Sequence, residues 1–98
     1  MRVEIKDKNL GIAKDDLEVV VQLVRFSLGR FANRIGRATI FLEKDSTPKV
    51  RCRLTLRVSR ETIVVEAVGM DLNSTSARAA TRAFGSVGRF LARERAAR

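Results

Sequence analysis

The sequence predicts an α+β fold with the order β-α-β-β-β-α, in which a four-stranded sheet carries two helices packed on one face. Three observations lead to this prediction. Apolar residues recur with a helical period in two long segments and with a period of two in four short segments. A long helical segment separates the first two strands, as a parallel pair requires, whereas tight turns join the next three strands into an antiparallel meander. The length of 98 residues fits one core, so we expect residues 1–98 to form a single α/β domain.

The first strand and the first helix follow from the spacing of their apolar residues. Val3 and Ile5 alternate with charged residues, which predicts a strand at about 2–8. From Asp15 to Ile35 the apolar residues have helical spacing and fall within a stripe of about 80°. This stripe consists of Leu17, Val20, Val21, Val24, Leu28, Phe31 and Ile35.

The ends of this predicted helix carry capping and dipole signals. Asp15 and Glu18 are spaced as a capping pair, so we expect the helix to begin there. Acidic residues at its start and Arg34 near its end suit the helix dipole. Gly36 is expected to stop it.

Three strands are expected after this helix, because the apolar period changes to two. The second strand is expected at 38–43, followed by a turn at Asp45-Ser46-Thr47-Pro48. The third strand, Val50–Val58, has the cleanest alternation in the chain. Its apolar face holds Val50, Cys52, Leu54, Leu56 and Val58, and its other face, expected to look outward, holds Arg51, Arg53, Thr55 and Arg57. After a turn around Arg60-Glu61, a fourth strand at Thr62–Val68 is apolar on both faces.

A last helix is expected to run to about Arg95, with Asp71 or Ser74 as its cap. Its expected buried stripe is Ala77, Ala80, Phe84, Val87 and Leu91. Its basic ridge is Arg78, Arg82, Arg89 and Arg93. At about 100° per residue this ridge lies nearly opposite the expected core face.

The net charge of +9 is the most informative feature of the composition. Twenty Lys and Arg stand against eleven Asp and Glu, and most of the excess lies in residues 25–60. Fifteen of the twenty are Arg, whose planar fork binds phosphate with two parallel hydrogen bonds. This balance indicates a polyanionic partner, most often nucleic acid and sometimes an anionic membrane surface.

The expected compartment is the cytoplasm. No run of about 18 apolar residues is present, so no membrane span is predicted. The charged start of the chain does not resemble a secretory signal. Cys52 is the only cysteine, which excludes an internal disulfide and fits a reducing environment.

The inventory of reactive side chains argues against an enzyme. With no His and one Cys, the chain cannot assemble a Ser-His-Asp triad, a Cys-His pair or an ordinary zinc site. The adjacent Asp15 and Asp16 are explained by capping, and Cys52 by a place in the core. Gly85-Ser86-Val87-Gly88 matches the phosphate-clamping loop of KH domains by letter, but it lies within a helical pattern and is read as a chance match. No cofactor and no metal are expected.

Two periodicities independently produce basic rows, one on the third strand and one on the last helix. We expect RNA to contact the ridge residues Arg78, Arg82, Arg89 and Arg93 and the strand residues Arg51, Arg53 and Arg57. Few acids interleave with them, and like charges side by side on a strand are destabilising unless a partner neutralises them. Aromatic stacking is poorly supplied, because only Phe41 lies on the outer face of a strand.

The first helix has a second apolar face. Val19, Leu23 and Phe26 fall at about 180–240°, opposite the main stripe. Either a curled terminus or loop covers them, or they form a surface for self-association or for a protein partner. The second reading makes a homo-oligomeric interaction module the alternative function. A third reading is an enzyme subunit whose catalytic groups lie on another chain.

The order β-α-β-β-β-α with a basic last helix resembles the ribosome hibernation promoting factors, also called ribosome-associated inhibitor or sigma-54 modulation proteins, in a short form. The resemblance covers essentially the whole chain and rests on pattern. The segments that carry it are Val3-Glu4-Ile5, Arg34-Ile35, Ala38-Thr39-Ile40-Phe41-Leu42, Val65-Glu66-Ala67 and Met70-Asp71. The resemblance implies binding to ribosomal RNA in the decoding channel of the small subunit and inhibition of translation under stress. It also implies that the ridge arginines of the last helix contact RNA phosphates.

Overall fold

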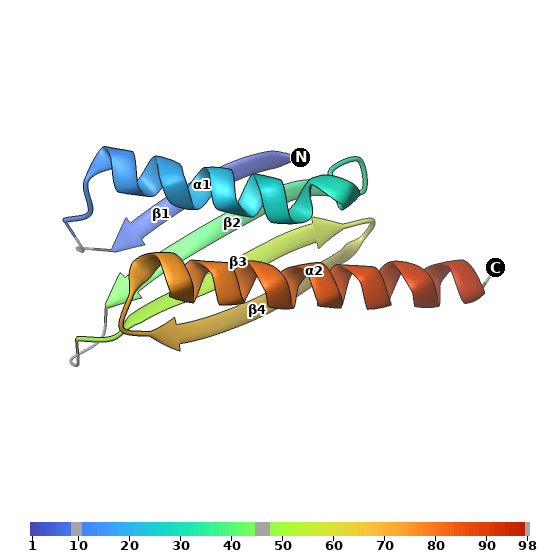
Figure 1. The fold of residues 1–98 in the computed structure, drawn as a ribbon. Coiled ribbons are helices and arrows are strands. Elements are labelled where there is room, and N and C mark those ends of the chain that lie inside the picture. The colour runs from blue at the N-terminus through green and yellow to red at the C-terminus, as the bar shows by residue number, and fades with distance from the viewer. Residues whose placement is uncertain (9–10, 45–47, 98) are drawn as a thin grey trace.

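The computed structural model describes residues 1–8, 11–44 and 48–97, which form a four-stranded sheet and two long helices (Figure 1). The elements in chain order are β1 (Arg2–Lys8), α1 (Lys14–Leu28), the 3-10 helix η1 (Gly29–Phe31), β2 (Ile35–Lys44), β3 (Val50–Val58), β4 (Glu61–Gly69) and α2 (Leu72–Ala96). The predicted fold class and element order are confirmed. The turn expected at residues 45–48 lies largely outside the described residues, which resume at Pro48.

The strands lie side by side in the order β1-β2-β3-β4. β1 pairs with β2 in parallel, with Val3 opposite Ala38 and Ile5 opposite Ile40. β2–β3 and β3–β4 are antiparallel, so the predicted meander is confirmed. The parallel pair is possible because α1 carries the chain back along the sheet between the two strands.

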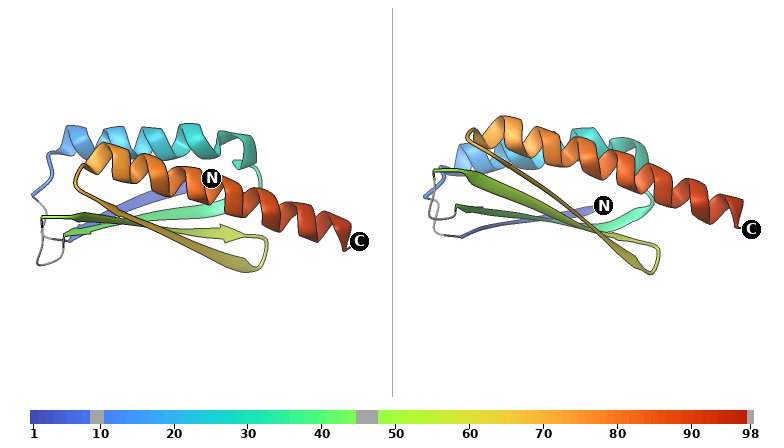
Figure 2. Two further views of the ribbon diagram at one scale, coloured as in Figure 1. Left: turned by 60° about the horizontal axis from the view of Figure 1, so that its bottom comes forward. Right: turned by 90° about the horizontal axis from the view of Figure 1, so that it is seen from below.

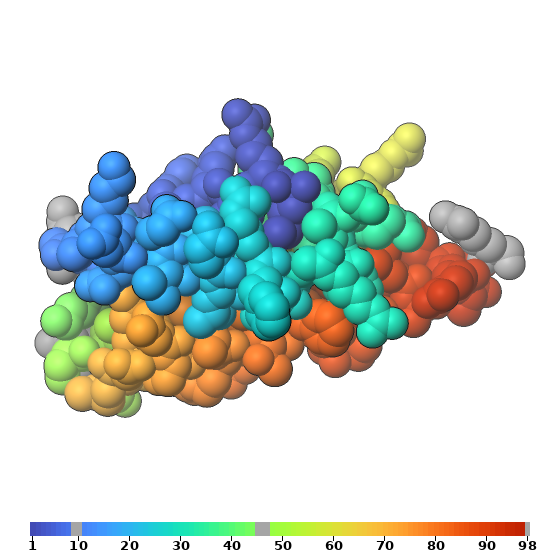
Figure 3. All heavy atoms as spheres, turned by 45° about the horizontal axis from the view of Figure 1, so that its top comes forward, coloured from blue at the N-terminus to red at the C-terminus, as the bar shows by residue number. Residues whose placement is uncertain are grey.

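Both helices cover the same face of the sheet, and the other face is left open (Figure 2). In the space-filling view the two helices lie against each other along the covered side (Figure 3). Side chains from both layers meet there and are fully buried, including Val24 of α1, Leu54 and Leu56 of β3, and Val87 of α2. The alternation predicted for β3 is confirmed, since its apolar residues enter this core and Arg53 and Arg57 are exposed.

The first helix is shorter than the sequence predicts. α1 ends at Leu28, and the chain tightens into η1 before β2 begins at Ile35. Gly29 weakens the helix at this point, and Ile35 is buried as the first residue of a strand instead of the last residue of a helix. The expected cap is also wrong. Ala13 occupies the N-cap position without a side-chain hydrogen bond, and Asp15 lies in the first turn.

The buried side of α2 is rotated relative to the prediction. Its buried residues are Thr75, Ser76, Ala79, Ala80, Ala83, Val87 and Leu91. The expected core residue Ala77 is half-buried, and Phe84 is 37% exposed with its ring 5.1 Å from that of Phe31. At 100° per residue the centre of the buried side moves by roughly 70° toward the arginines. Small side chains let α2 pack closely on the sheet, whereas the larger Phe84 ring fits at the border with α1.

Of the two residues predicted to cap the start of α2, Asp71 and Ser74, the structure confirms Asp71. Asp71 is the N-cap residue, and its Oδ2 accepts a hydrogen bond of 2.8 Å from the backbone N–H of Ser74. The strand before it, β4, runs from Glu61 to Gly69 and is apolar on both faces, as predicted. Its outward apolar residues Val64 and Val68 are exposed.

The junction between β4 and α2 leaves no room for a side chain at Gly69. A Cβ there would collide with Thr75 Oγ1 and Arg78 Nη2, and Thr75 is fully buried. We therefore expect Gly69→Ala to destabilise the protein by about 1–3 kcal/mol, the usual cost of overpacking. Gly29→Ala is the matched control. Gly29 has a right-handed helical φ of −55° and open space around it, so this change should stabilise by about 0.4–1 kcal/mol. Denaturant unfolding of both variants measures the two effects, and equal effects would contradict the packing assignment.

Cys52 lies in the core, as predicted. Burial raises the pKa of its thiol from 9.0 to about 11, and a hydrogen bond with the Ser76 side chain lowers this pKa by a smaller amount. The native thiol therefore stays protonated at pH 8. A raised folded-state pKa contributes stability that is present below pH 9 and lost as the pH rises toward 11. We expect a thiol reagent at pH 8 to label the protein only after denaturant is added. Rapid labelling of the native protein would contradict this placement.

Candidate nucleic-acid interface

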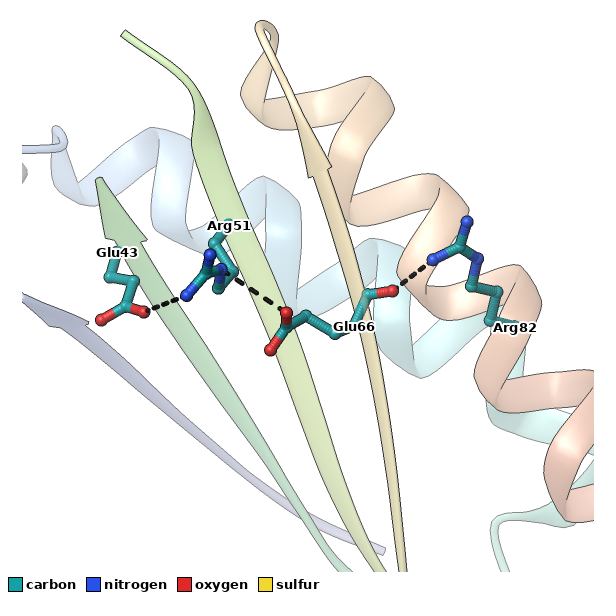
Figure 4. Close-up of polar contacts among 4 residues, drawn as sticks. All are labelled: Glu43, Arg51, Glu66 and Arg82. Atoms are coloured by element: carbon teal, nitrogen blue, oxygen red, sulfur yellow. Dashed lines mark hydrogen bonds and ion pairs between the residues drawn. The ribbon is translucent and has the colours of Figure 1, made fainter. Parts of the chain in front are cut away.

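The open face of the sheet carries the predicted strand arginines, but the structure gives each a different environment. Arg51 lies between two carboxylates, with Nη1 3.3 Å from Glu43 Oε1 and Nε 3.5 Å from Glu66 Oε1 (Figure 4). These ion pairs form because Glu43 and Arg51 are register partners on β2 and β3, while Glu66 lies on β4 beside them. The charge of Arg51 is therefore already compensated within the fold.

Arg53 contacts an aromatic ring. Its guanidinium carbon lies 4.7 Å from the centroid of Phe41, and Lys6 Nζ lies 5.5 Å from the same centroid. These cation–π contacts hold two positive charges against the one aromatic ring of the outer face. A nucleic-acid base would have to displace one of these cations, or stack on the guanidinium, to use this site.

Arg57, unlike Arg51 and Arg53, has neither an ion pair nor a ring contact among the described residues. Its Nη1 donates to Thr62 Oγ1 at 3.4 Å. Within the described ranges no carboxylate oxygen lies within 4.0 Å of its guanidinium. Sequence reasoning missed two arginines that join it. Arg2 and Arg37 are register partners on β1 and β2, and Arg37 is paired with Arg57 across β2–β3. Only the strand register reveals this row, since the three residues are far apart in the chain.

The sequence predicts that the helix ridge lies opposite the core, and this prediction is wrong because the buried side of α2 is rotated toward the ridge. Its first half runs beside the edge of β4. Arg78 Nη2 donates to the carbonyl of Val68 at 2.6 Å, and Arg82 Nη1 donates to the carbonyl of Glu66 (Figure 4). These bonds satisfy carbonyl groups that an edge strand would otherwise present to other chains. Each guanidinium has five N–H donors, so further donors remain for a ligand.

The second half of the ridge is more open. Arg89 Nη2 donates to Ser86 Oγ at 3.3 Å, and Arg93 is exposed and lines a hollow beside the β3–β4 turn together with Arg60. The C-terminal part of α2 extends past the end of the sheet (Figure 2). Arg34 is outside this ridge and is paired with Glu94 at 2.8 Å, which ties the end of α2 to the segment before β2.

The outer face of α1 is uncovered. Phe26 is 90% exposed and Val19 is 48% exposed, while Leu23 is half-buried. No part of the described chain folds over Phe26 and Val19. Of the two alternatives that the sequence left open, a covering terminus or loop is therefore not found among the described residues. The Gly85–Gly88 segment lies within α2, as its helical pattern predicted.

The described residues contain no group of three or more His, Cys, Asp or Glu side chains that is arranged to hold a metal ion. In the same part of the chain, no helix has the length and apolar character needed to cross a membrane.

These observations define an α+β domain of two layers, with helices on one face of a mixed sheet and arginines on the other face and along the outer side of α2. No protein-family model and no curated protein sequence matches the chain. Solved structures do match. A ribosomal subunit interface protein from Coxiella burnetii superposes with a TM-score of 0.78 at 16% identity, covering 94% of this chain and 99% of that one.

The N-terminal domain of Protein Y from Thermus thermophilus superposes with a TM-score of 0.71 at 22% identity, covering 92% of this chain and 99% of that domain. The fold of this protein is therefore the one found in that ribosomal subunit interface protein and in the N-terminal domain of Protein Y. The resemblance that the sequence suggested is confirmed for the fold.

The two halves of the ridge are expected to differ in their effect on stability. Arg78→Ala with Arg82→Ala removes two hydrogen bonds to edge carbonyls and should destabilise by about 0.5–1 kcal/mol each, a value at the low end because the groups are exposed. Arg89→Ala with Arg93→Ala is the matched control, since it removes the same charge and neither edge bond. Denaturant unfolding compares the two pairs. Equal losses would show that the contacts with β4 contribute nothing specific.

Proposed function

We propose that this protein is a non-catalytic, cytoplasmic RNA-binding factor that binds ribosomal RNA in the decoding channel of the small ribosomal subunit and inhibits translation under stress. One observation carries the proposal. The chain has a net charge of +9, and it places arginines with few nearby acids on the surface of a fold that it shares with a ribosomal subunit interface protein. The fold alone would not assign an RNA ligand, because one fold hosts many functions. The charge narrows the choice to a polyanion.

The residues proposed to contact RNA differ in availability. On α2, the hydrogen bonds to the carbonyls of β4 come from Arg78 and Arg82 and not from Arg89 or Arg93, so the latter two can turn toward phosphate without breaking those bonds. Arg78 and Arg82 can bind phosphate only with the donors that the carbonyls of β4 do not use. On the sheet, Arg53 and Arg57 are proposed as stronger ligands than Arg51, whose charge two glutamates already compensate.

A second candidate function is self-association through the outer face of α1. The observation that favours it is the 90% exposure of Phe26 next to exposed Val19. An apolar contact of this kind does not explain the arginine excess, and the three residues Val19, Leu23 and Phe26 form a small surface. RNA binding and a homodimer also respond to salt in opposite ways, because phosphate contacts weaken steeply with salt whereas apolar contacts hold or tighten.

The proposal predicts that Arg89→Glu with Arg93→Glu abolishes co-sedimentation with small ribosomal subunits in a density gradient at low salt. These positions are chosen because neither holds the edge of β4, so the variant should remain folded by circular dichroism. Arg25→Glu with Arg30→Glu changes the net charge equally at residues of α1 and η1, outside the ridge, and is the control. Wild type and control should sediment with subunits and lose the interaction at moderate salt. Equal loss in both variants, or no loss in either, would overturn the assignment.

A further inference from the structure

A second cationic surface lies on the open sheet face, at the end of the sheet where β3 turns into β4. The register places Arg2, Arg37 and Arg57 side by side on β1, β2 and β3. Neighbouring strands lie about 4.8 Å apart, so three guanidinium-bearing residues fall within about 10 Å across the sheet. The next strand continues the row with Thr62, the register partner of Arg57. No other row of the described sheet brings three arginines together.

The row borders a hollow of about 540 Å³, which we name the arginine cradle. Its polar lining consists of Arg2, Arg37, Arg57, Thr39, Thr55 and Thr62. Thr39 and Thr55 are register partners in the middle of the sheet, and Thr39 is only 8% exposed at the base of the hollow. Hydroxyl groups and guanidinium groups therefore line the hollow together, with Thr62 in the row of the arginines and Thr39 and Thr55 in the adjacent row.

The charge of the cradle is poorly compensated. Glu4 is the carboxylate nearest to the row, with Oε1 3.8 Å from Arg37 Nε, which is too long for a hydrogen bond. Within the part of the chain that the structure describes, neither Arg2 nor Arg57 has an ion pair. At the other end of the same face, by contrast, Arg51 is held between two glutamates. The arginines of the cradle are thus less compensated than Arg51 at the other end of the face.

We propose that the arginine cradle binds a phosphate group of an RNA strand, an inference that rests on the RNA-binding function proposed above. Guanidinium forks and hydroxyl donors together match the oxygens of a phosphate. An anion between the three arginines relieves the repulsion that their adjacency creates. A base is a poor occupant, because the cradle contains no aromatic ring, and a cation is excluded by the charge. The phosphate comes either from the backbone of the strand or from a terminal monoester.

The test is an NMR titration of the folded protein at low salt, followed at the backbone amides of Thr39, Thr55 and Thr62. The probes are inorganic phosphate, then pentauridine with a 5′-hydroxyl or a 5′-phosphate. Saturable shifts at these amides are expected with each probe. Arg37→Gln with Arg57→Gln should lower the RNA affinity measured from these shifts by about tenfold, because two charge-assisted contacts in an exposed site are lost. Arg25→Gln with Arg30→Gln lowers the net charge equally on the helical layer and should change the same affinity by less than about twofold.

The two RNA probes distinguish the sources of the phosphate. Equal affinity for both assigns the cradle to a backbone phosphodiester, and tighter binding of the phosphorylated strand assigns it to a terminal monoester. Poly-glutamate is the competitor, and its binding at the cradle as tightly as RNA would overturn the phosphate assignment in favour of an acidic protein. Absence of shifts, or equal weakening by both variant pairs, would also overturn it. Failure of ribosome co-sedimentation with cradle shifts retained would instead reject only the ribosomal part of the proposed function.

Discussion

Burial of the sheet on one face only is the constraint on which the rest of this structure depends. Two helices cover one side, so every strand that runs beneath them must alternate between core and solvent. Leu54 and Leu56 are fully buried under the helices, while Arg53 and Arg57, their neighbours in β3, are exposed. The same alternation that builds the core therefore displays the arginines. Any substitution that slipped the register of β3 by one residue would bury arginines and expose leucines, which makes this register strongly specified.

The parts of the fold that local sequence determines were predictable. The alternation of β3 and the Asp71 cap of α2 depend on residues a few positions apart, so the sequence pattern contains them. The end of α1 and the rotation of α2 were not predictable in the same way. Periodicity marks Phe84 as a member of an apolar stripe but does not show that the buried side of α2 is formed largely by small residues such as Ala79 and Ala83. Complementarity of size appears only when two elements are brought together.

In the candidate site, too, local sequence predicts some features and only the tertiary structure reveals the others. Sequence patterns identified most of the arginines but not their partners, because partners come from register. Glu66 is the clearest case: its carboxylate lies 3.5 Å from Arg51, and its carbonyl accepts from Arg82 of α2 (Figure 4). One residue of the edge strand thus lowers the effective charge of the sheet and fixes a ridge arginine at once. A count of arginines along the chain treats Arg51, Arg82 and Arg57 as equal, whereas the structure gives them three different environments.

These environments divide the protein electrostatically along its length. At the end where β2 leaves the sheet, Arg51 is compensated by glutamates on both sides. At the opposite end lie the arginine cradle and the β3–β4 turn, and Arg60 of that turn lines the same hollow as Arg93 of α2. Fields of unpaired charges add over such distances, whereas paired charges largely cancel beyond about a Debye length. Glu4 is the one carboxylate within 4.0 Å of the cradle arginines among the described residues, and Glu61 and Glu94 border the hollow of Arg60 and Arg93. The repulsion between the arginines at this end is therefore only partly relieved within the fold, whereas that of Arg51 is relieved on both sides.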